Sequence, residues 1–270
     1  MLSPPELETV DRIADHLSRA RSVLFITGAG ISADSGLPTY RGVGGLYNTG
    51  ETEEGLAIEE LLSGDMMQSR PDWTWKYLRQ IEHASRGACH NRGHSVIAEM
   101  EQHFPRVWTL TQNVDGFHRA AGSRNVIAIH GDLHRIRCTK CPWNQDVTDY
   151  AHLAELPRCA KCSAVLRPDV VLFGEMLPEP ALRELDFQMR EGFDIIFSIG
   201  TTSVFPYIKS PVEIARQRDK PTVEINPGTT CLSGKVRYRL ALSAAVALDA
   251  IWLRYREKHN QSTQPAQEGA

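Results

Sequence analysis

The sequence predicts an α/β protein built on a doubly wound parallel sheet, with a small zinc-ribbon domain and a helical insertion. Short apolar runs alternate with helical patterns, and each run ends on glycine or polar residues, which is typical of parallel sheets that bind ligands at the strand ends. Four cysteines stand in two close pairs within a segment that has few apolar residues. The main domain is therefore expected to be Rossmann-like, with a metal-stabilised unit attached to it.

The order of the expected elements follows from their periodicity. Apolar residues recur at helical spacing over residues 5–20, which predicts a first helix. The continuous apolar run over residues 22–27 predicts a buried parallel strand. A helix should follow between Ile31 and Gly36. Further strands are expected at residues 107–111, 126–129, 194–198 and 222–225, and a last helix from near Ser243.

The predicted domain organisation is discontinuous. Residues 1–38, 91–132 and 166–258 should form the Rossmann-like domain, and residues 39–90 an irregular loop with a helical module. Residues 133–165, which hold the four paired cysteines, should form the metal-binding module. The end of the chain, 259–270, is rich in Gln, Ser, Thr and Pro and is expected to be a disordered tail.

Composition excludes several classes of partner. Hydrophobic residues make up 41% of the 270 residues and charged residues 23%, the net charge is −3 and the pI is about 6.4. No basic stripe predicts nucleic-acid binding, and no apolar run is long enough to cross a membrane. Acidic residues precede any apolar block at the N-terminus, unlike a secretory or transit peptide, so a cytoplasmic protein is expected. Nothing in the sequence sets the oligomeric state.

The paired cysteines predict one structural zinc ion. Cys138 and Cys141 form the first pair, and Cys159 and Cys162 the second. Four thiolates with this spacing close a tetrahedron and leave no open position for water. Four unrelated buried thiols are the alternative, but a segment with so little core of its own needs metal binding to fold.

A glycine loop follows the first predicted strand. Gly28, Ala29 and Gly30 would allow a tight turn and a close approach of a pyrophosphate to the following helix N-terminus. The next glycine is Gly36, so the spacing differs from the usual dinucleotide fingerprint. A tight strand-to-helix turn without a ligand explains the loop about as well.

Two other predicted strands also end on polar residues. Gln112, Asn113 and Asp115 could recognise a carboxamide and a ribose, although a turn with Asx hydrogen bonds is an equal alternative. His130 follows the third strand and could act as a general base near neutral pH. The sequence has ten histidines, and a typical histidine is structural or solvated, so position alone distinguishes His130.

Read together, these segments resemble the sirtuin family over roughly residues 20–250. Residues 28–41, GAGISADSGLPTYR, are similar to the opening motif of that family, and residues 111–115, TQNVD, to its second motif. The pair His130-Gly131 resembles the catalytic histidine motif, and the cysteine pairs its zinc module. Later motifs follow in the same order, at Phe173-Gly174-Glu175, Gly200-Thr201-Thr202 and Ile225-Asn226.

The resemblance implies an enzyme that uses NAD as co-substrate to remove acyl groups from protein lysine side chains. NAD would lie along the sheet edge, under a cofactor loop within residues 39–90. Asn113 and Asp115 would seat the nicotinamide carboxamide, and Gln112 the adjacent ribose. The remaining cofactor-binding residues would be Gly28, Ala29, Gly30, Ser32, Arg41, Gly200, Thr201 and Thr202 at the phosphates, and Asn226 and Ala244 at the adenosine.

The implied catalytic residues are His130, Asn113 and Asp115. The acyl oxygen would attack the anomeric carbon, and His130 would deprotonate a ribose hydroxyl that attacks the resulting imidate. The products would be lysine, nicotinamide and an acyl-ADP-ribose. Phe173, Gly174 and Glu175 would bind the acyl-lysine protein as an added extended strand.

Residues 42–47 look nearest to the sirtuin branch that accepts acidic acyl groups. That branch carries a Tyr and an Arg three residues apart, whereas here Tyr77 and Arg79 are two apart and Lys76 has the three-residue spacing. Lys76 or Arg79 could attract an acyl carboxylate, with two solvated charges as the alternative. We therefore expect deacetylation first, with wider deacylation open. Two prolines, Pro206 and Pro227, also depart from the family pattern and should shift nearby loops.

Two other functions compete with deacylation. A mono-ADP-ribosyltransferase on the same scaffold would share NAD cleavage, but it would not need the base His130. A zinc-ribbon module that binds protein or nucleic acid is the alternative from another class, and the acidic pI counts against nucleic acid.

Overall fold

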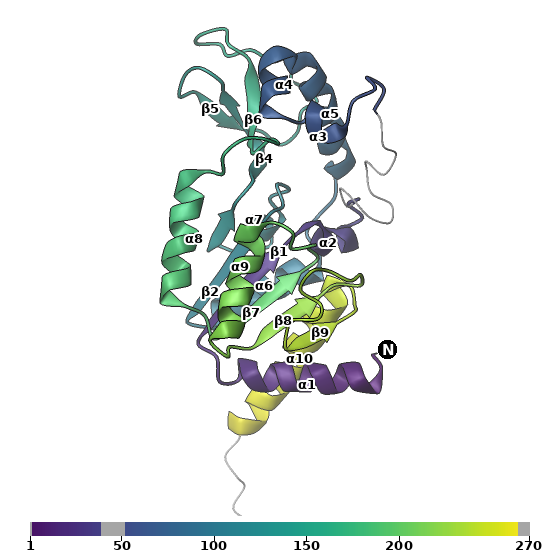
Figure 1. The fold of residues 1–270 in the computed structure, drawn as a ribbon, viewed down its shortest axis with the longest axis vertical. Coiled ribbons are helices and arrows are strands. Elements are labelled where there is room, and N and C mark those ends of the chain that lie inside the picture. The colour runs from purple at the N-terminus through teal and green to yellow at the C-terminus, as the bar shows by residue number, and fades with distance from the viewer. Residues whose placement is uncertain (1, 39–51, 264–270) are drawn as a thin grey trace, which may run out of the picture.

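Six parallel strands form the central sheet of the protein (Figure 1). The structure, a computed structural model, describes residues 2–38 and 52–263. Across the sheet the order is β3-β2-β1-β7-β8-β9, which is a doubly wound arrangement with its switch point between β1 and β7. The strands are β1 (Ser22–Thr27), β2 (Arg106–Thr111), β3 (Val126–Ala128), β7 (Ile195–Ile199), β8 (Thr222–Ile225) and β9 (Tyr238–Leu240).

Helices cover both faces of the sheet, which explains why its strands are continuously apolar. Val23 and Phe25 of β1 pack in the core that contains α1 (Pro4–Leu17), α6 (Arg92–His103) and α10 (Ala244–Thr263). Leu24 and Ile26 point to the opposite face and pack against α8 (Glu179–Glu191) and α9 (Pro206–Gln217). Two short helices, α2 (Ala29–Ser32) and α7 (Phe117–Ala120), follow β1 and β2 at their carboxyl ends.

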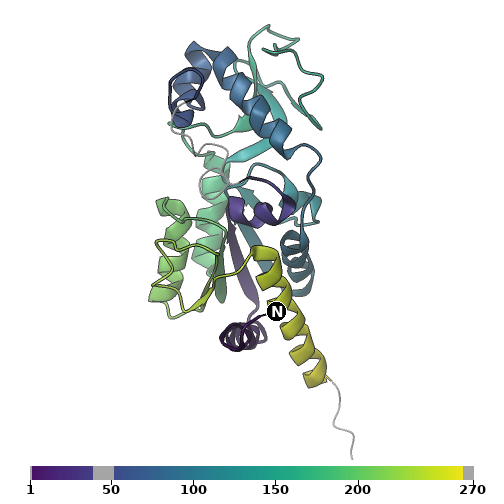
Figure 2. The ribbon, with the colours of Figure 1, turned by 90° about the vertical axis from the view of Figure 1, so that its right-hand side faces the viewer.

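A second, smaller domain lies beyond one end of the sheet (Figures 1 and 2). It contains an antiparallel sheet of order β5-β4-β6 and the helices of the insertion, which share one apolar core. Trp75 and Tyr150 meet edge to face in this core, and the Trp75 indole donates to Leu166 O at 2.8 Å. The elements are β4 (Gly131–Cys138), β5 (Asn144–Asp146), β6 (Leu166–Val170), α3 (Ile58–Leu61), α4 (Gly64–Ser69) and α5 (Pro71–Ser85).

The parallel sheet, the first helix and the strands expected from the sequence are confirmed, but some boundaries differ. The strand Leu166–Val170, placed by sequence in the Rossmann-like domain, pairs with β4 in the small sheet. The last helix continues through His259 to Thr263, where a disordered tail was expected. The expected helix at 31–36 is the short α2, followed by a 3-10 turn at Ala33–Ser35 (η1). Among the helices of the described ranges, none has the length and apolar character to cross a membrane.

Candidate active site

Two glycine segments cross at the switch point of the sheet. Gly28 N donates to Ile199 O at 3.0 Å, and Gly30 N donates to Gly200 O at 2.8 Å. A Cβ on Gly30 would lie 2.5 Å from Gly200 Cα, so any larger residue would force the two segments apart. This crossing places the start of α2 at the carboxyl edge, where doubly wound sheets bind phosphates.

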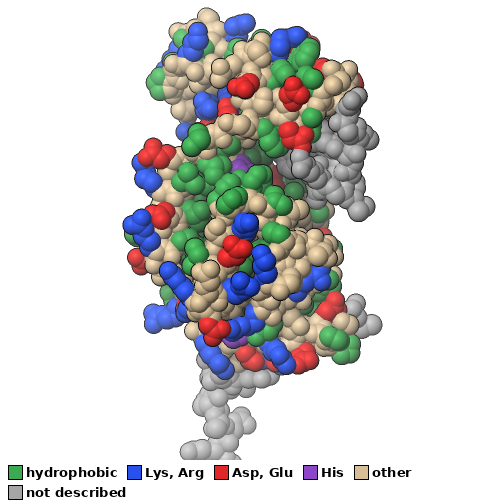
Figure 3. Space-filling view, in the orientation of Figure 1, with side chains coloured by type: hydrophobic (Ala, Val, Ile, Leu, Met, Phe, Trp, Pro, Cys, Tyr) green, Lys and Arg blue, Asp and Glu red, His purple; other side chains and the backbone are tan. Residues whose placement is uncertain are grey.

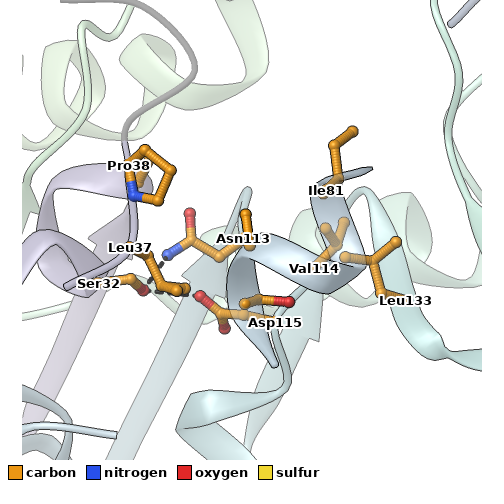
Figure 4. Close-up of a pocket in the computed structure, with 11 residues that line it drawn as sticks. Ser32, Leu37, Pro38, Ile81, Asn113, Val114, Asp115 and Leu133 are labelled. Atoms are coloured by element: carbon orange, nitrogen blue, oxygen red, sulfur yellow. Dashed lines mark hydrogen bonds between the residues drawn. The ribbon is translucent and has the colours of Figure 1, made fainter. Parts of the chain in front are cut away.

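Ser32, Asn113 and Asp115 form a hydrogen-bonded group beside this crossing, and Figure 4 shows their side chains pointing toward one another. Asn113 Nδ2 donates to Ser32 Oγ and to Gly28 O, both at 3.1 Å. Ser32 Oγ donates to Asp115 Oδ2 at 2.7 Å. Burial raises the pKa of Asp115, and the hydrogen bond from Ser32 opposes that shift. The amide and the carboxylate expected at the nicotinamide are thus together.

A mostly apolar pocket surrounds this group. Its walls come from the glycine loop and the turn after it, from the segment that follows β2, and from α5 and β4 of the small domain, so it lies between the two domains. The lining residues are Ala29, Ser32, Leu37, Pro38, Ile81, Ala84, Ser85, Asn113, Val114, Asp115 and Leu133. An apolar cavity with a few convergent polar groups is the usual form of a small-molecule site.

The other expected cofactor residues lie along the same edge. Gln112 Nε2 donates to Thr201 Oγ1 at 2.8 Å, and Asn226 Nδ2 donates to Thr201 O at 3.1 Å. Thr202 is exposed, and Ala244 is buried at the first residue of α10. Arg41, expected at the phosphates, lies outside the described residues, as does the segment 42–47.

His130 is held at both ring nitrogens. Its Nδ1 lies 3.0 Å from Gln112 O, and its Nε2 lies 2.8 Å from the Tyr207 hydroxyl. Burial lowers the pKa of His130, which keeps the ring neutral near pH 7. A carbonyl oxygen can only accept, so the proton sits on Nδ1 and Nε2 carries the lone pair. That arrangement fits a general base, and Tyr207 is a contact that sequence reasoning missed.

The segment expected to bind peptide is paired on one edge with residues 62–64. Phe173 N donates to Leu62 O at 2.9 Å, and Gly64 N donates to Phe173 O at 3.0 Å. Gly174 has a φ of 80° and open space around it. Two side chains of this segment, Phe173 and Met176, are exposed and apolar, and so are Val204 and Phe205 before α9. Figure 3 shows hydrophobic side chains gathered around a histidine in the hollow between the domains.

Glu175 does not offer its side chain to a ligand. Its carboxylate accepts from the Arg167 guanidinium at 2.5 and 2.9 Å and from Leu172 N at 2.9 Å. Arg167 is 4% exposed, and its ion pair with Glu175 joins the segment expected to bind peptide to β6 of the small domain. Only the backbone of Glu175 remains for substrate. Sequence reasoning missed Arg167, because nothing local marks it as the partner.

Lys76 and Arg79 are not brought to the pocket. Lys76 Nζ contacts Glu53 at 2.7 Å and Glu54 at 2.6 Å. Arg79 donates to the carbonyls of Tyr150 at 3.0 Å and Leu153 at 3.2 Å, and also to that of Ala154. A different face of α5, with Ile81, Ala84 and Ser85, lines the pocket. Both cations are engaged in holding the small domain together.

The four predicted cysteines converge at the tip of the small domain. All four sulfurs lie within 4.8 Å of one another, and no cysteine among the six forms a disulfide. Cys138 Sγ is 3.4 Å from Cys162 Sγ, and Cys141 Sγ is 3.7 Å from Cys159 Sγ. Zinc with four thiolates at about 2.3 Å requires sulfur separations of about 3.8 Å, so this donor set fits the ion. The cluster supports the predicted structural zinc site.

The glycine crossing, the interdomain pocket, the held histidine and the four-thiolate cluster define a nucleotide-binding protein of the doubly wound class with a structural metal centre. The model of the Sir2 family matches residues 28–206, and the chain belongs to this family. That match includes the glycine loop, His130 and the four cysteines.

Known proteins agree with this assignment. An NAD-dependent protein deacylase 2 from Pseudomonas aeruginosa is 51% identical over 231 residues, covering 84% of this chain and 90% of the relative. A solved Sir2 homologue in complex with ADP-ribose has a TM-score of 0.82 at 34% identity, covering 98% of this chain and 100% of the other. A Sir2 variant with a deacetylated p53 peptide and acetyl ADP-ribose has a TM-score of 0.80 at 26% identity, covering 90% and 96%.

Proposed function

We propose that this protein removes acyl groups from protein lysine side chains in an NAD-dependent reaction that yields nicotinamide and acyl-ADP-ribose. The observation that carries the proposal is that the neutral His130 is hydrogen-bonded to the backbone of Gln112, the residue directly before Asn113 of the group formed by Ser32, Asn113 and Asp115. Relatives that are 51% and 50% identical bear the name NAD-dependent protein deacylase 2. The base and the carboxamide-binding groups are the parts that this reaction needs.

The residues at the sheet edge suit an NAD molecule. The phosphates would be held by residues of the two glycine segments and their neighbours: Gly28, Ala29, Gly30, Ser32, Arg41, Gly200, Thr201 and Thr202. Asn226 and Ala244 would border the adenosine, and Gln112 the nicotinamide ribose. Asn113 and Asp115 would hold the carboxamide, because an amide and a carboxylate can match its donors and acceptors. Aligning NAD with the acyl-lysine supplies much of the rate.

His130 would act on the ribose. Its Nδ1–H is fixed by Gln112 O, so Nε2 carries the lone pair that would take the proton of a ribose hydroxyl. The acyl oxygen would first displace nicotinamide from the anomeric carbon. The ribose hydroxyl would then attack the imidate carbon, the lysine amine would leave with a proton, and one water molecule would supply the oxygen that completes acyl-ADP-ribose.

The acyl-lysine protein would bind as an extended strand along Phe173, Gly174 and Glu175. The edge of this segment away from Leu62 carries no strand among the described residues, and main-chain pairing tolerates many peptide sequences. Both cations considered for an acidic acyl group, Lys76 and Arg79, are engaged elsewhere, which favours uncharged groups such as acetyl. We place the reaction in the cytoplasm, where acyl-lysine proteins and NAD are both present.

The direct test is release of nicotinamide from NAD with and without an acetyl-lysine peptide. We expect release that depends on the peptide and is abolished in His130→Ala, while that variant still binds ADP-ribose. Nicotinamide release that does not depend on the acetyl-lysine peptide would contradict the proposed mechanism. Full nicotinamide release by the His130→Ala variant would also contradict it.

A further inference from the structure

The base nitrogen of His130 is already occupied in the protein without its substrates. Tyr207 Oη lies 2.8 Å from His130 Nε2. Because Gln112 O requires the proton on Nδ1, Nε2 of the neutral ring must accept, and the Tyr207 hydroxyl donates. A neutral imidazole has one such lone pair, and this hydrogen bond uses it.

Tyr207 is fixed in the position that makes this contact. It lies in the first turn of α9, directly after Pro206 at the helix start. Its ring stacks on Phe205 at 5.5 Å with an interplanar angle of 13°, and both rings meet His130 edge to face. The proline precedes the tyrosine here, which makes Tyr207 the second residue of α9.

The Tyr207 hydroxyl has the properties of a donor to this nitrogen. Burial raises the pKa of Tyr207 above its ordinary value of 10, so the phenol is protonated at neutral pH. Among the described residues, His130 is the only hydrogen-bond partner that the structure gives this hydroxyl. The two aromatic rings beside it, Phe205 and its own, offer no competing acceptor.

We propose that the Tyr207 hydroxyl holds the base nitrogen of His130 until a ribose hydroxyl of the dinucleotide takes its place, which makes Tyr207 a positioning residue of the active site. The inference rests on the proposed function, because a ribose hydroxyl must reach Nε2. One lone pair cannot accept two protons, so ligand binding has to break the Tyr207–His130 hydrogen bond. The Tyr207–His130 hydrogen bond keeps the imidazole ring oriented before the ligand binds. Ligand binding is weakened by the free energy of this hydrogen bond, because the bond must be broken.

A double-mutant cycle with ADP-ribose tests this competition by calorimetry. Tyr207→Phe keeps the stacked ring but has no hydroxyl to displace, so we expect it to bind ADP-ribose about 2- to 10-fold more tightly, the worth of one ordinary hydrogen bond. In a His130→Ala background the same substitution should have no effect, because the bond is already absent. Tyr255→Phe is the matched control, since its hydroxyl lies 2.8 Å from His103 Nε2, far from the pocket, and its affinity should not change.

Unchanged or weaker binding by Tyr207→Phe would overturn the proposal, and so would an equal gain in the His130→Ala background. These outcomes leave the proposed function standing, provided that the unmodified protein binds ADP-ribose. A protein that fails to bind ADP-ribose at all would contradict the proposed function together with this inference.

Discussion

Arg167 and Glu175 form a two-pronged ion pair between the small sheet and the segment proposed to bind peptide. The guanidinium comes from β6 and is almost fully buried, with its side chain 5% exposed. The carboxylate belongs to the turn that carries Phe173 and Gly174. Burial raises the pKa of Glu175, but the hydrogen bonds from Arg167 and from the Leu172 N–H, together with nearby positive charge, lower it by more, so the net pKa is below its ordinary value. The ion pair between Arg167 and Glu175 therefore fixes the turn at residues 173–175 to the small sheet.

We expect Glu175→Gln to destabilise the protein by about 3 kcal/mol at pH 7, because it leaves a buried guanidinium without its counter-charge. The stabilisation from Glu175 is present above its ordinary pKa of 4.5 and is lost as the pH falls through its lowered folded value. Denaturant unfolding at pH 7 and at pH 4 measures both effects. Glu179→Gln, which breaks an exposed pair with Arg183, is the control and should cost less than about 1 kcal/mol. Equal costs for the two variants would contradict the anchoring role.

Gly30→Ala should disrupt the crossing with Gly200. The added Cβ would lie 2.5 Å from backbone atoms that cannot rotate away, and overpacking of this kind costs about 1–3 kcal/mol. We expect lower thermal stability and weaker ADP-ribose binding. Gly234→Ala is the matched control, because a Cβ there meets nothing within 4 Å. A Gly30→Ala protein with unchanged affinity would show that the crossing does not contact the ligand.

One zinc ion per chain should co-purify with the protein. Cys159→Ser removes one of four ligands, so we expect loss of the metal and of the fold of the small domain, whose core includes Cys138 and Cys159. Metal analysis and near-ultraviolet circular dichroism measure these effects. Cys89→Ser changes an exposed cysteine outside the cluster and should keep the zinc. A folded protein without zinc would contradict the assignment.

The pH dependence of kcat/KM for NAD should report the ionisation of His130. Burial lowers the pKa of this residue, and the protonated ring has no lone pair to act as a base. Activity should therefore fall on the acid side with a midpoint below 6.5, the ordinary histidine value. A midpoint at or above 6.5 would show that another group controls the acid side or that His130 is exposed in the working enzyme.

Local sequence patterns were sufficient to predict β1, β2, β3, β7 and β8 of the parallel sheet and the four-cysteine cluster, but not β9 or the three strands of the small sheet. A buried parallel strand is a continuous apolar run, and its end is marked by glycine or amide residues such as Gly28 and Asn113. The spacing between Cys138 and Cys141, which is typical of zinc ligands, can be read directly from the sequence. Each of these patterns involves residues that are close together in the sequence. The structure confirms the five predicted strands and the cysteine cluster.

Long-range contacts could not be predicted in the same way. Tyr207 meets His130 across 77 positions of the chain, and Arg79 reaches carbonyls more than 70 positions away. A charge on a helix has the same local pattern whether it faces a pocket, solvent or another loop, which is why Lys76 and Arg79 were placed at the substrate. The shared core of the insertion and the zinc module likewise depends on packing between distant segments, such as Trp75 on Leu166.

Mass spectrometry of the reaction products tests the central claim most directly. The protein would be incubated with NAD and separate peptides that carry acetyl, succinyl and long-chain acyl lysine, with His130→Ala in parallel. We predict acyl-ADP-ribose together with the free lysine peptide, first for the acetyl peptide, and neither product from the variant. ADP-ribose attached to protein, with every acyl-lysine peptide left intact, would contradict deacylation and identify a transferase instead.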